Sequence, residues 1–288
     1  MSTTLGSRER RTYSRRTTAA KLILPLLAAA TASCDRPAAH ETEIGQWIWS
    51  STDSALFADA TRSIPNLVPT VWIGTIRGSG DGEVHAQLAL SPRVSGRSTA
   101  GVVVRFDDDF SSVWAVRTDS AVGYAVGMAL RDMLAAAQRS GVTVSEVQLD
   151  YDCPERLLRR WSAVIAILSR GALAGRRVWI TSLISHVRHA EYGDLFRANV
   201  AGHIVQLFDT GDRMSLPYTR QIERLVSRHR MPFRLGVGAF ERRLANGQTT
   251  DHEAWFEAPH IMRGSRWYRG VWVFPGNVSW AHLLEPTR

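Results

Sequence analysis

The sequence predicts a single parallel α/β barrel. Eight short apolar runs rich in β-branched residues recur after residue 45, and most of them are followed by a stretch with helical patterning. Strands that alternate with helices favour a parallel sheet, and eight repeats in about 240 residues fit one TIM-type barrel. The alternative is a doubly wound open sheet, which is disfavoured because no glycine-rich turn follows the first predicted strand.

The order of the predicted elements follows the same alternation. Gly141 is a helix stop signal, and Pro154 occupies the favoured first turn of a helix. Residues 84–90 form an extra strand, and no helix is evident between the second and third barrel strands, so the barrel is expected to be irregular there. The strands cover residues 46–49, 69–76, 100–106, 145–150, 177–183, 203–208, 234–238 and 270–274, and the helices cover residues 54–62, 120–139, 154–169, 190–199 and 217–229.

Residues 1–33 have the order of a secretory signal peptide. Basic residues precede a short apolar run, and small residues lead to Cys34. The stretch Thr31-Ala-Ser-Cys34 resembles a bacterial lipobox, although threonine stands where leucine is usual. We therefore expect an exported protein that is lipid-anchored to the cell membrane at Cys34 and faces the periplasm. Its polar tether would cover residues 34–44 and its barrel domain residues 45–288.

Two alternatives to this N-terminal interpretation remain open. The apolar run, which is too short to span a bilayer, would instead be a buried helix of the fold. Cys34 would instead form a disulfide with Cys153, the only other cysteine of the chain.

The charge distribution argues against a nucleic-acid partner. The chain has a formal net charge of +8, but residues 1–33 hold six basic residues and one acidic residue, which is +5 of that total. The remaining residues carry a net charge of only +3 and no long basic block, so we expect no nucleic-acid binding.

The sequence lacks the residues that several kinds of catalytic or cofactor site require. Lys21 is the only lysine, so the mature chain offers none for a Schiff base or a P-loop. No Gly-x-Ser-x-Gly elbow is present, and the histidines do not have metal-ligand spacing. We predict no cofactor and no metal site.

The strongest local pattern is the nonapeptide Glu146-Val-Gln-Leu-Asp-Tyr-Asp-Cys-Pro154. Alternate residues of a strand share a face, so Glu146, Gln148, Asp150 and Asp152 would face the barrel interior and its mouth. A close carboxylate pair raises one pKa, which suits acid/base catalysis, so Asp150 and Asp152 are the candidate catalytic residues. The alternative is a helix N-cap at Asp152 and a hydrogen-bonded core carboxylate at Asp150.

This nonapeptide resembles the fourth-strand motif of the bacterial domain-of-unknown-function 3142 family, a group of uncharacterised glycoside-hydrolase-type TIM barrels. It is also similar to the Asp-x-Asp-x-Glu strand of family 18 glycoside hydrolases, the chitinases. Asp150 and Asp152 match the two aspartates, but Pro154 stands where that family has its general-acid glutamate, and Glu155 is one residue late. The resemblance implies a sugar-related barrel, but it does not carry over the chitinase mechanism.

Other polar and aromatic side chains lie on predicted strands or at their ends. Aromatic rings at a barrel mouth stack on sugar rings, and amides and carboxylates bind hydroxyl groups. The aspartates that follow residue 106 are interpreted as a solvated loop. The candidate substrate-binding residues are Trp49, Trp72, Gln148, Gln206, Asp209 and Glu241.

These observations lead to two hypotheses. The favoured one is a membrane-tethered barrel that acts on or binds an envelope or extracellular polysaccharide, a carbohydrate partner. The rival is a non-catalytic lipoprotein scaffold that binds glycan or another protein. An ion pair between Asp150 and Arg105 would favour the scaffold.

Overall fold

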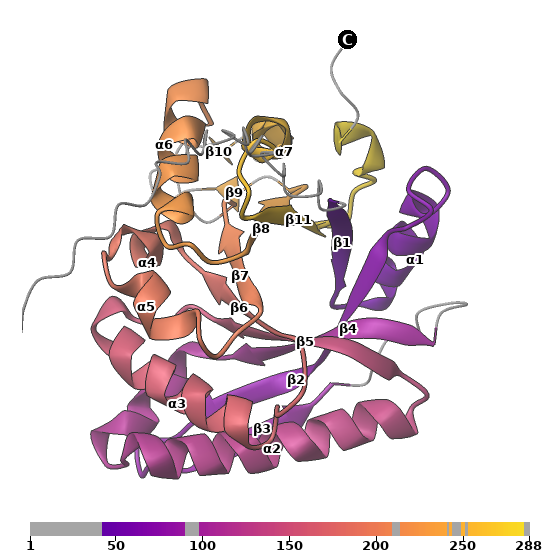
Figure 1. Ribbon diagram of the computed structural model, residues 1–288. Helices are drawn as coiled ribbons and strands as arrows, with labels where there is room; N and C mark the ends of the chain where they lie inside the picture. Colours follow the sequence, from indigo (N-terminus) through magenta and orange to yellow (C-terminus); the bar gives the residue numbers. More distant parts are fainter. Residues whose placement is uncertain are drawn as a thin grey trace, which may run out of the picture. The chain divides into compact units, whose positions relative to one another are not determined.

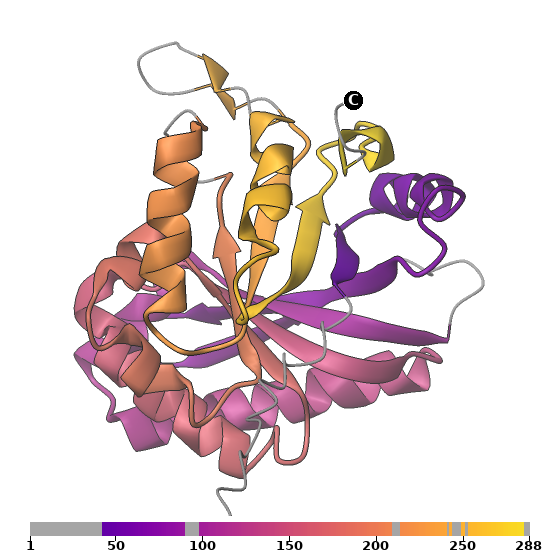
Figure 2. The same cartoon turned by 45° about the horizontal axis from the view of Figure 1, so that its top comes forward.

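Eight parallel strands form a closed ring in the computed structural model, which describes residues 42–89, 98–208, 214–240, 242–243, 249–250 and 253–284. The ring closes because the last strand pairs with the first, as Figures 1 and 2 show. The predicted TIM-type barrel is therefore confirmed. In ring order, the strands are β1 (Glu43–Ile48), β2 (Val68–Gly78), β4 (Thr99–Phe106), β5 (Thr143–Tyr151), β6 (Val178–Ser182), β7 (Gly202–Gln206), β8 (Phe233–Gly238) and β11 (Tyr268–Phe274).

Helices lie outside the ring and cover it (Figure 1). The predicted helix 154–169 is a 3-10 turn, η2 (Glu155–Leu157), followed by α3 (Leu158–Arg170), and the helix predicted at 190–199 is the short α5 (Tyr192–Phe196). No helix in the described ranges is both long and apolar enough to cross a membrane. The other helical elements are α1 (Ser51–Ala60), η1 (Asp108–Ala115), α2 (Asp119–Arg139), α4 (Ile184–Arg188), α6 (Leu216–Ser227), η3 (Glu253–Glu257), α7 (Ala258–Met262) and η4 (Ala281–Leu284).

The barrel is irregular where the sequence predicted it. Between β2 and β4 the described residues hold β3 (Val84–Leu88), which pairs antiparallel with β2 outside the ring, in place of a helix. A short hairpin of β9 (Arg242–Arg243) and β10 (Thr249–Thr250) follows β8. The barrel belongs to one compact unit, Ala39–Arg288, and its core lies within that unit, so we expect this unit to fold on its own.

The barrel strands have two buried faces, one outward and one inward, and different residues pack on each. The outward face packs against the helices in a large apolar core that includes Val147 and Leu149 of β5. The inward face is filled by three buried tryptophans, Trp47, Trp179 and Trp272.

Glycines on neighbouring strands provide the room for these rings. A Cβ atom on Gly45 would lie 2.2 Å from the Trp272 ring, and one on Gly202 would lie 2.4 Å from the Trp179 ring. Any larger residue at these two positions would collide with an indole.

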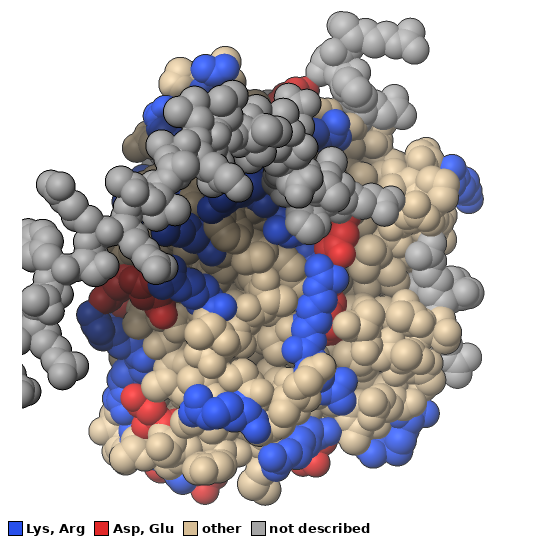
Figure 3. Space-filling view, viewed as in Figure 1, with Lys and Arg blue, Asp and Glu red and all other residues tan. Residues whose placement is uncertain are grey.

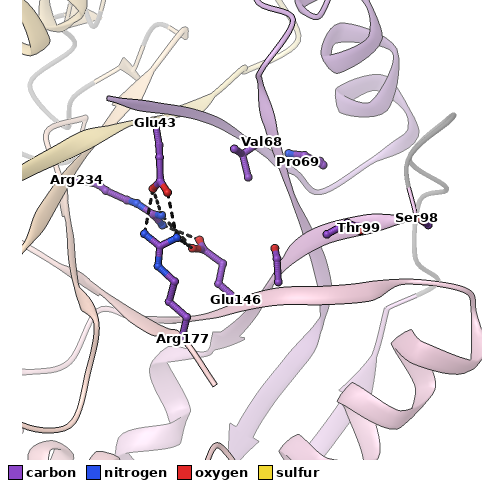
Figure 4. Close-up of a pocket in the computed structure, with 9 residues that line it drawn as sticks. Glu43, Val68, Pro69, Ser98, Thr99, Glu146, Arg177 and Arg234 are labelled. Carbon is purple, nitrogen blue, oxygen red and sulfur yellow. Dashed lines mark hydrogen bonds and ion pairs between the residues drawn. The ribbon is translucent and has the colours of Figure 1, made fainter. Parts of the chain in front are cut away.

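Four charged side chains lie at the amino-terminal end of the interior and point toward one another (Figure 4). Fully buried Arg234 donates to both carboxylate oxygens of Glu146, at 2.6 and 3.0 Å, and it also contacts Glu43. Arg177 donates to the two oxygens of Glu43 at 3.0 and 3.3 Å. Burial raises the pKa of Glu43, but Arg234 and Arg177 together bring it below its usual value. We call these four residues the basal quartet.

Arg234 is also held by aromatic rings. Its guanidinium carbon lies 3.7 Å from the Trp179 ring centre and 3.6 Å from that of Trp272. Arginine stacks well in this way because its charge is planar and weakly hydrated. A cavity of about 480 Å³ lies beside the basal quartet and is bounded on its other side by residues that include Val68 and Thr99.

Three histidines are buried between the barrel and the helices around Tyr192. His203 is fully buried, and its Nδ1 lies 2.9 Å from the hydroxyl of Ser182. Nε2 of His186 is paired with the carbonyl of Cys153, and Nε2 of His229 with that of Val187. Burial lowers the pKa of all three, and it lowers that of His203 to about 3.

These shifts predict a loss of stability in acid. Unfolded His203 titrates near pH 6.5, so below that pH the unfolded chain binds a proton that the folded chain excludes. The contribution of His203 to the free energy of unfolding is therefore fully present above about pH 6.5. It decreases, by at most about 1.4 kcal/mol per pH unit, as the pH falls toward 3. Urea unfolding at several pH values between 7 and 5 measures the free energy of unfolding. The difference in this free energy between wild type and His203→Asn should shrink as the pH falls, while the exposed control His85→Asn should follow wild type. A constant difference would contradict this assignment.

Candidate functional site

The carboxyl ends of the barrel strands surround a cavity of about 310 Å³. This volume lies within the usual range for small-molecule sites, about 300 to 1,000 Å³. In a TIM barrel this end is where active sites form. The lining residues are Trp47, Trp49, Arg105, Asp108, Asp150, Asp152, Gln206, Phe208, Phe240 and Phe274.

One side of the cavity carries carboxyl groups. Asp150 is the penultimate residue of β5 and is half-buried, while Asp152 follows the strand and is exposed. Both line the cavity, as the alternation of the strand predicts, and Asp108 joins them from the start of η1, just after β4. Asp152 is not the N-cap residue of either following helical element, because Pro154 is the N-cap of η2 and Leu157 that of α3.

Asp150 is held by two neutral donors. The Gln206 amide donates to its Oδ1 at 3.1 Å, and the Thr181 hydroxyl also hydrogen-bonds to the carboxyl group. Thr181 is oriented for this because its oxygen accepts the backbone N–H of Tyr151 at 3.0 Å. Burial raises the pKa of Asp150, and Thr181, Arg105 and Gln206 only partly offset that rise. A carboxyl group in this state holds a proton at higher pH than usual and suits a proton donor.

Asp150 does not form the ion pair that would favour a scaffold. Within the described part of the chain, Arg105 lies 3.5 Å from Asp107, whose other carboxylate oxygen is 2.7 Å from Arg77. The charge of Arg105 is therefore shared with the neighbouring loop, and no arginine among the described side chains forms an ion pair with Asp150.

The other side of the cavity is aromatic. Trp49, Phe208, Phe240 and Phe274 lie at or just beyond the ends of four different strands. Phe274 lies 5.5 to 6.1 Å from each of the other three, ring centre to ring centre. A cavity with an apolar wall opposite polar groups matches the two faces of a pyranose ring.

Trp49 is fixed by the start of the following helix. The Ser50 hydroxyl accepts the N–H of Asp53, and the Asp53 carboxylate accepts the N–H of Trp49 at 2.9 Å. This reciprocal capping starts α1 at Ser51, three residues before the predicted start.

Two predicted binding residues do not line the cavity. Trp72 packs behind Trp49, at 5.5 Å between ring centres, and its indole N–H is donated to the carbonyl of Gly74. Gln148 is fully buried in the barrel interior and is not among the residues that line the cavity.

Gln148 instead links the basal quartet to the cavity. Its amide nitrogen donates to Glu146 at 2.8 Å, which leaves its oxygen to accept the indole N–H of Trp47 at 2.6 Å. Trp47 lines the cavity. The charged groups at the base therefore orient a ring at the mouth.

Asp209 and Glu241 lie outside the described residues, as does Cys34. Thr181, Arg105, Asp108 and the phenylalanine wall were not predicted as site residues. A position at the end of a predicted strand is the one signal that marks most of them, and Phe208 and Phe274 end predicted strands.

Neither a reactive thiol nor a metal centre forms in the described part of the chain. Cys153 is a free, buried cysteine, and burial raises the pKa of its thiol to about 12, so it is unreactive at neutral pH. No group of three or more His, Cys, Asp or Glu side chains among these residues is arranged to hold a metal ion.

The fold is shared with chitinases and with a spore cortex-lytic enzyme. A chitinase from Chromobacterium violaceum superposes with a TM-score of 0.61 at 12% identity, over 86% of this chain and all (100%) of the chitinase. The family 18 chitinase ChiB of Flavobacterium johnsoniae gives 0.56 at 8% identity, over 85% of this chain and 93% of that one. The spore cortex-lytic enzyme SleL of Bacillus megaterium gives 0.54 at 9% identity, over 86% of this chain and 74% of that enzyme. No family model and no curated protein sequence matches the chain.

Proposed function

We propose that this protein binds a polysaccharide at the mouth of its barrel and hydrolyses glycosidic bonds there, with Asp150 as the proton donor. The single observation that carries this proposal is a half-buried carboxyl group of raised pKa, held by Gln206 and Thr181, in a cavity with an aromatic wall. The likeness of the fold to chitinases and to a cortex-lytic enzyme supports a polysaccharide as the ligand class.

The chemistry requires two carboxyl groups. Protonated Asp150 would give its proton to the glycosidic oxygen as the bond to the anomeric carbon breaks, and water would supply the hydroxyl group of the new reducing end. Asp152 is the expected partner carboxylate, because it lies on the same strand face and is exposed to the cavity. Trp49 and the phenylalanines would hold the sugar ring during this step.

A non-catalytic glycan-binding barrel is the second candidate. The observation that favours it is Pro154, which stands where the resembling family 18 motif has its general-acid glutamate. Membership of the domain-of-unknown-function 3142 family, which we propose from the nonapeptide, fits both candidates.

A polysaccharide panel tests the proposal. Wild type and Asp150→Asn would be incubated with chitin, peptidoglycan, xylan and alginate, and both reducing-end release and co-sedimentation would be measured. Hydrolysis by wild type alone supports the enzyme, and co-sedimentation without hydrolysis supports the binding module. Failure to bind or cleave any substrate, or equal hydrolysis by both proteins, would contradict the proposal.

We also propose that the protein is exported and anchored by a lipid on Cys34. The lipobox-like residues before Cys34 support this proposal, as does the buried, unreactive state of Cys153, which leaves Cys34 as the other thiol available for modification.

Labelling with radioactive palmitate in bacterial cells tests the anchor. We expect Cys34→Ala to abolish both labelling and recovery in the detergent phase, since no other residue would carry the lipid. The matched control Cys153→Ala should label like wild type. Labelling that survives in Cys34→Ala would refute the assignment.

A further inference from the structure

The loops at the amino-terminal end of the barrel carry a strongly one-sided charge. Each helix returns to the next strand through one of these loops, and six of them are described: residues 61–67, 140–142, 171–177, 197–201, 228–232 and 263–267. They contain no aspartate or glutamate. They contain eight arginines, of which all but Arg176 are exposed: Arg62, Arg176, Arg177, Arg197, Arg228, Arg230, Arg263 and Arg266.

The opposite end of the barrel differs in charge. Its described loops, together with the short η1 and η2, carry acidic residues that include Asp81, Glu83, Asp107, Asp108 and Asp152, among arginines such as Arg117 and Arg156. The barrel is therefore electrically polarised along its axis, with the candidate glycan site at the acidic end.

About half of these arginines are not neutralised locally. Arg62 pairs with Asp59, Arg197 with Asp194, and Arg177 with Glu43. Within the described ranges, Arg176, Arg230, Arg263 and Arg266 form no ion pair with a carboxylate, and Arg228 donates only to the backbone carbonyls of Val187 and Arg188. On the face of the molecule drawn in Figure 3, arginine side chains lie around a hollow. We call the eight arginines of these loops the basic face.

We propose that the basic face docks onto a membrane surface that contains anionic phospholipids. Guanidinium groups bind phosphate in a bidentate manner, and each basic residue near an anionic bilayer strengthens binding about fivefold. The barrel also begins at this end, because Glu43 is the first residue of β1 and a member of the basal quartet.

The proposed anchor brings the same end to the bilayer. Glu43 lies nine positions after Cys34, and a fully extended chain of nine residue steps reaches at most about 32 Å. Docking would then direct the mouth away from the membrane, toward glycan in the surrounding envelope. The arginines carry this inference, and the lipid on Cys34, which rests on the proposed function, would make the docking permanent.

Vesicle binding tests the docking without the lipid. The unit Ala39–Arg288 lacks both the basic signal segment and Cys34, so neither can contribute. We expect it to bind vesicles of phosphatidylcholine with phosphatidylglycerol at least about tenfold more tightly than vesicles of phosphatidylcholine alone, and to be released by salt.

Matched charge variants locate the surface. Arg230→Gln, Arg263→Gln and Arg266→Gln combined should weaken binding to anionic vesicles at least about tenfold. Arg117→Gln, Arg156→Gln and Arg159→Gln combined change the net charge equally at the mouth end and should bind like wild type. All six side chains are exposed, and thermal unfolding checks that both variants fold.

Three results would overturn the proposal. Binding that does not depend on phosphatidylglycerol would exclude a charged surface. Equal weakening by both triple variants would mean that only net charge matters. Tighter binding of a DNA duplex than of anionic vesicles would assign the basic face to nucleic acid. Loss of glycan hydrolysis alone would leave docking intact, so the two proposals fail separately.

Discussion

Replacing Asp150 by asparagine is expected to lower kcat for glycan hydrolysis at least about a hundredfold. Asparagine keeps the shape of the side chain and a group to pair with Gln206, but it has no acidic proton to give to the leaving oxygen. KM should change less than kcat, because the lost interaction forms only as the glycosidic bond breaks. Steady-state kinetics on the best substrate of the panel measure both parameters.

The pH dependence gives this prediction a second signature. Because burial raises the pKa of Asp150, the group is protonated and competent below that pKa, and wild-type activity should decline as the pH rises through it. That alkaline limb should be absent from the residual activity of Asp150→Asn. The surface control Asp194→Asn should keep both the wild-type rate and the limb. A wild-type rate in Asp150→Asn would remove this residue from the chemistry.

Breaking the basal quartet should produce the largest loss of stability. Arg234 is fully buried and neutralises both Glu146 and Glu43, so Arg234→Met would leave two carboxylates without their main cation. Removing one partner of a buried ion pair typically costs about 3 to 5 kcal/mol, because the remaining charge stays desolvated. Urea unfolding measures this cost.

Two further variants make the quartet prediction specific. Arg62→Met removes an exposed pair with Asp59 and should cost less than about 1 kcal/mol. Adding Glu146→Gln to Arg234→Met should recover part of the loss, because one stranded charge disappears. A loss in Arg234→Met no larger than that in Arg62→Met would show that the quartet is not a stabilising element.

The barrel and the position of its site were predictable from local pattern. Alternation along residues 146–152 places Val147 and Leu149 among the helices and the polar residues inside, which fixes both the face and the end of the strand. The same alternation could not separate Gln148 from Asp150. That distinction depends on depth in the barrel, which is set by how β5 registers against β4 and β6.

Contacts between strands that are distant in the sequence explain the other differences between the predicted and the observed site. Trp49 and Trp72 look alike in sequence, but only the packing of β1 against β2 shows that one ring covers the other. The basal quartet joins residues up to 191 positions apart, and isolated arginines and glutamates in a sequence resemble solvated surface. The difference in charge between the two ends of the barrel likewise depends on the topology, which places each loop at one end.

Calorimetry with soluble oligosaccharides from the substrate panel measures whether the mouth cavity binds glycan. Trp49 lines the cavity and its ring offers an apolar face, so Trp49→Ala should weaken binding about tenfold or more. Trp267→Ala, a partly buried tryptophan beside Arg266 at the other end of the barrel, should bind like wild type. Equal affinities for wild type and Trp49→Ala, or no binding by wild type, would mean that the mouth cavity is not a glycan site.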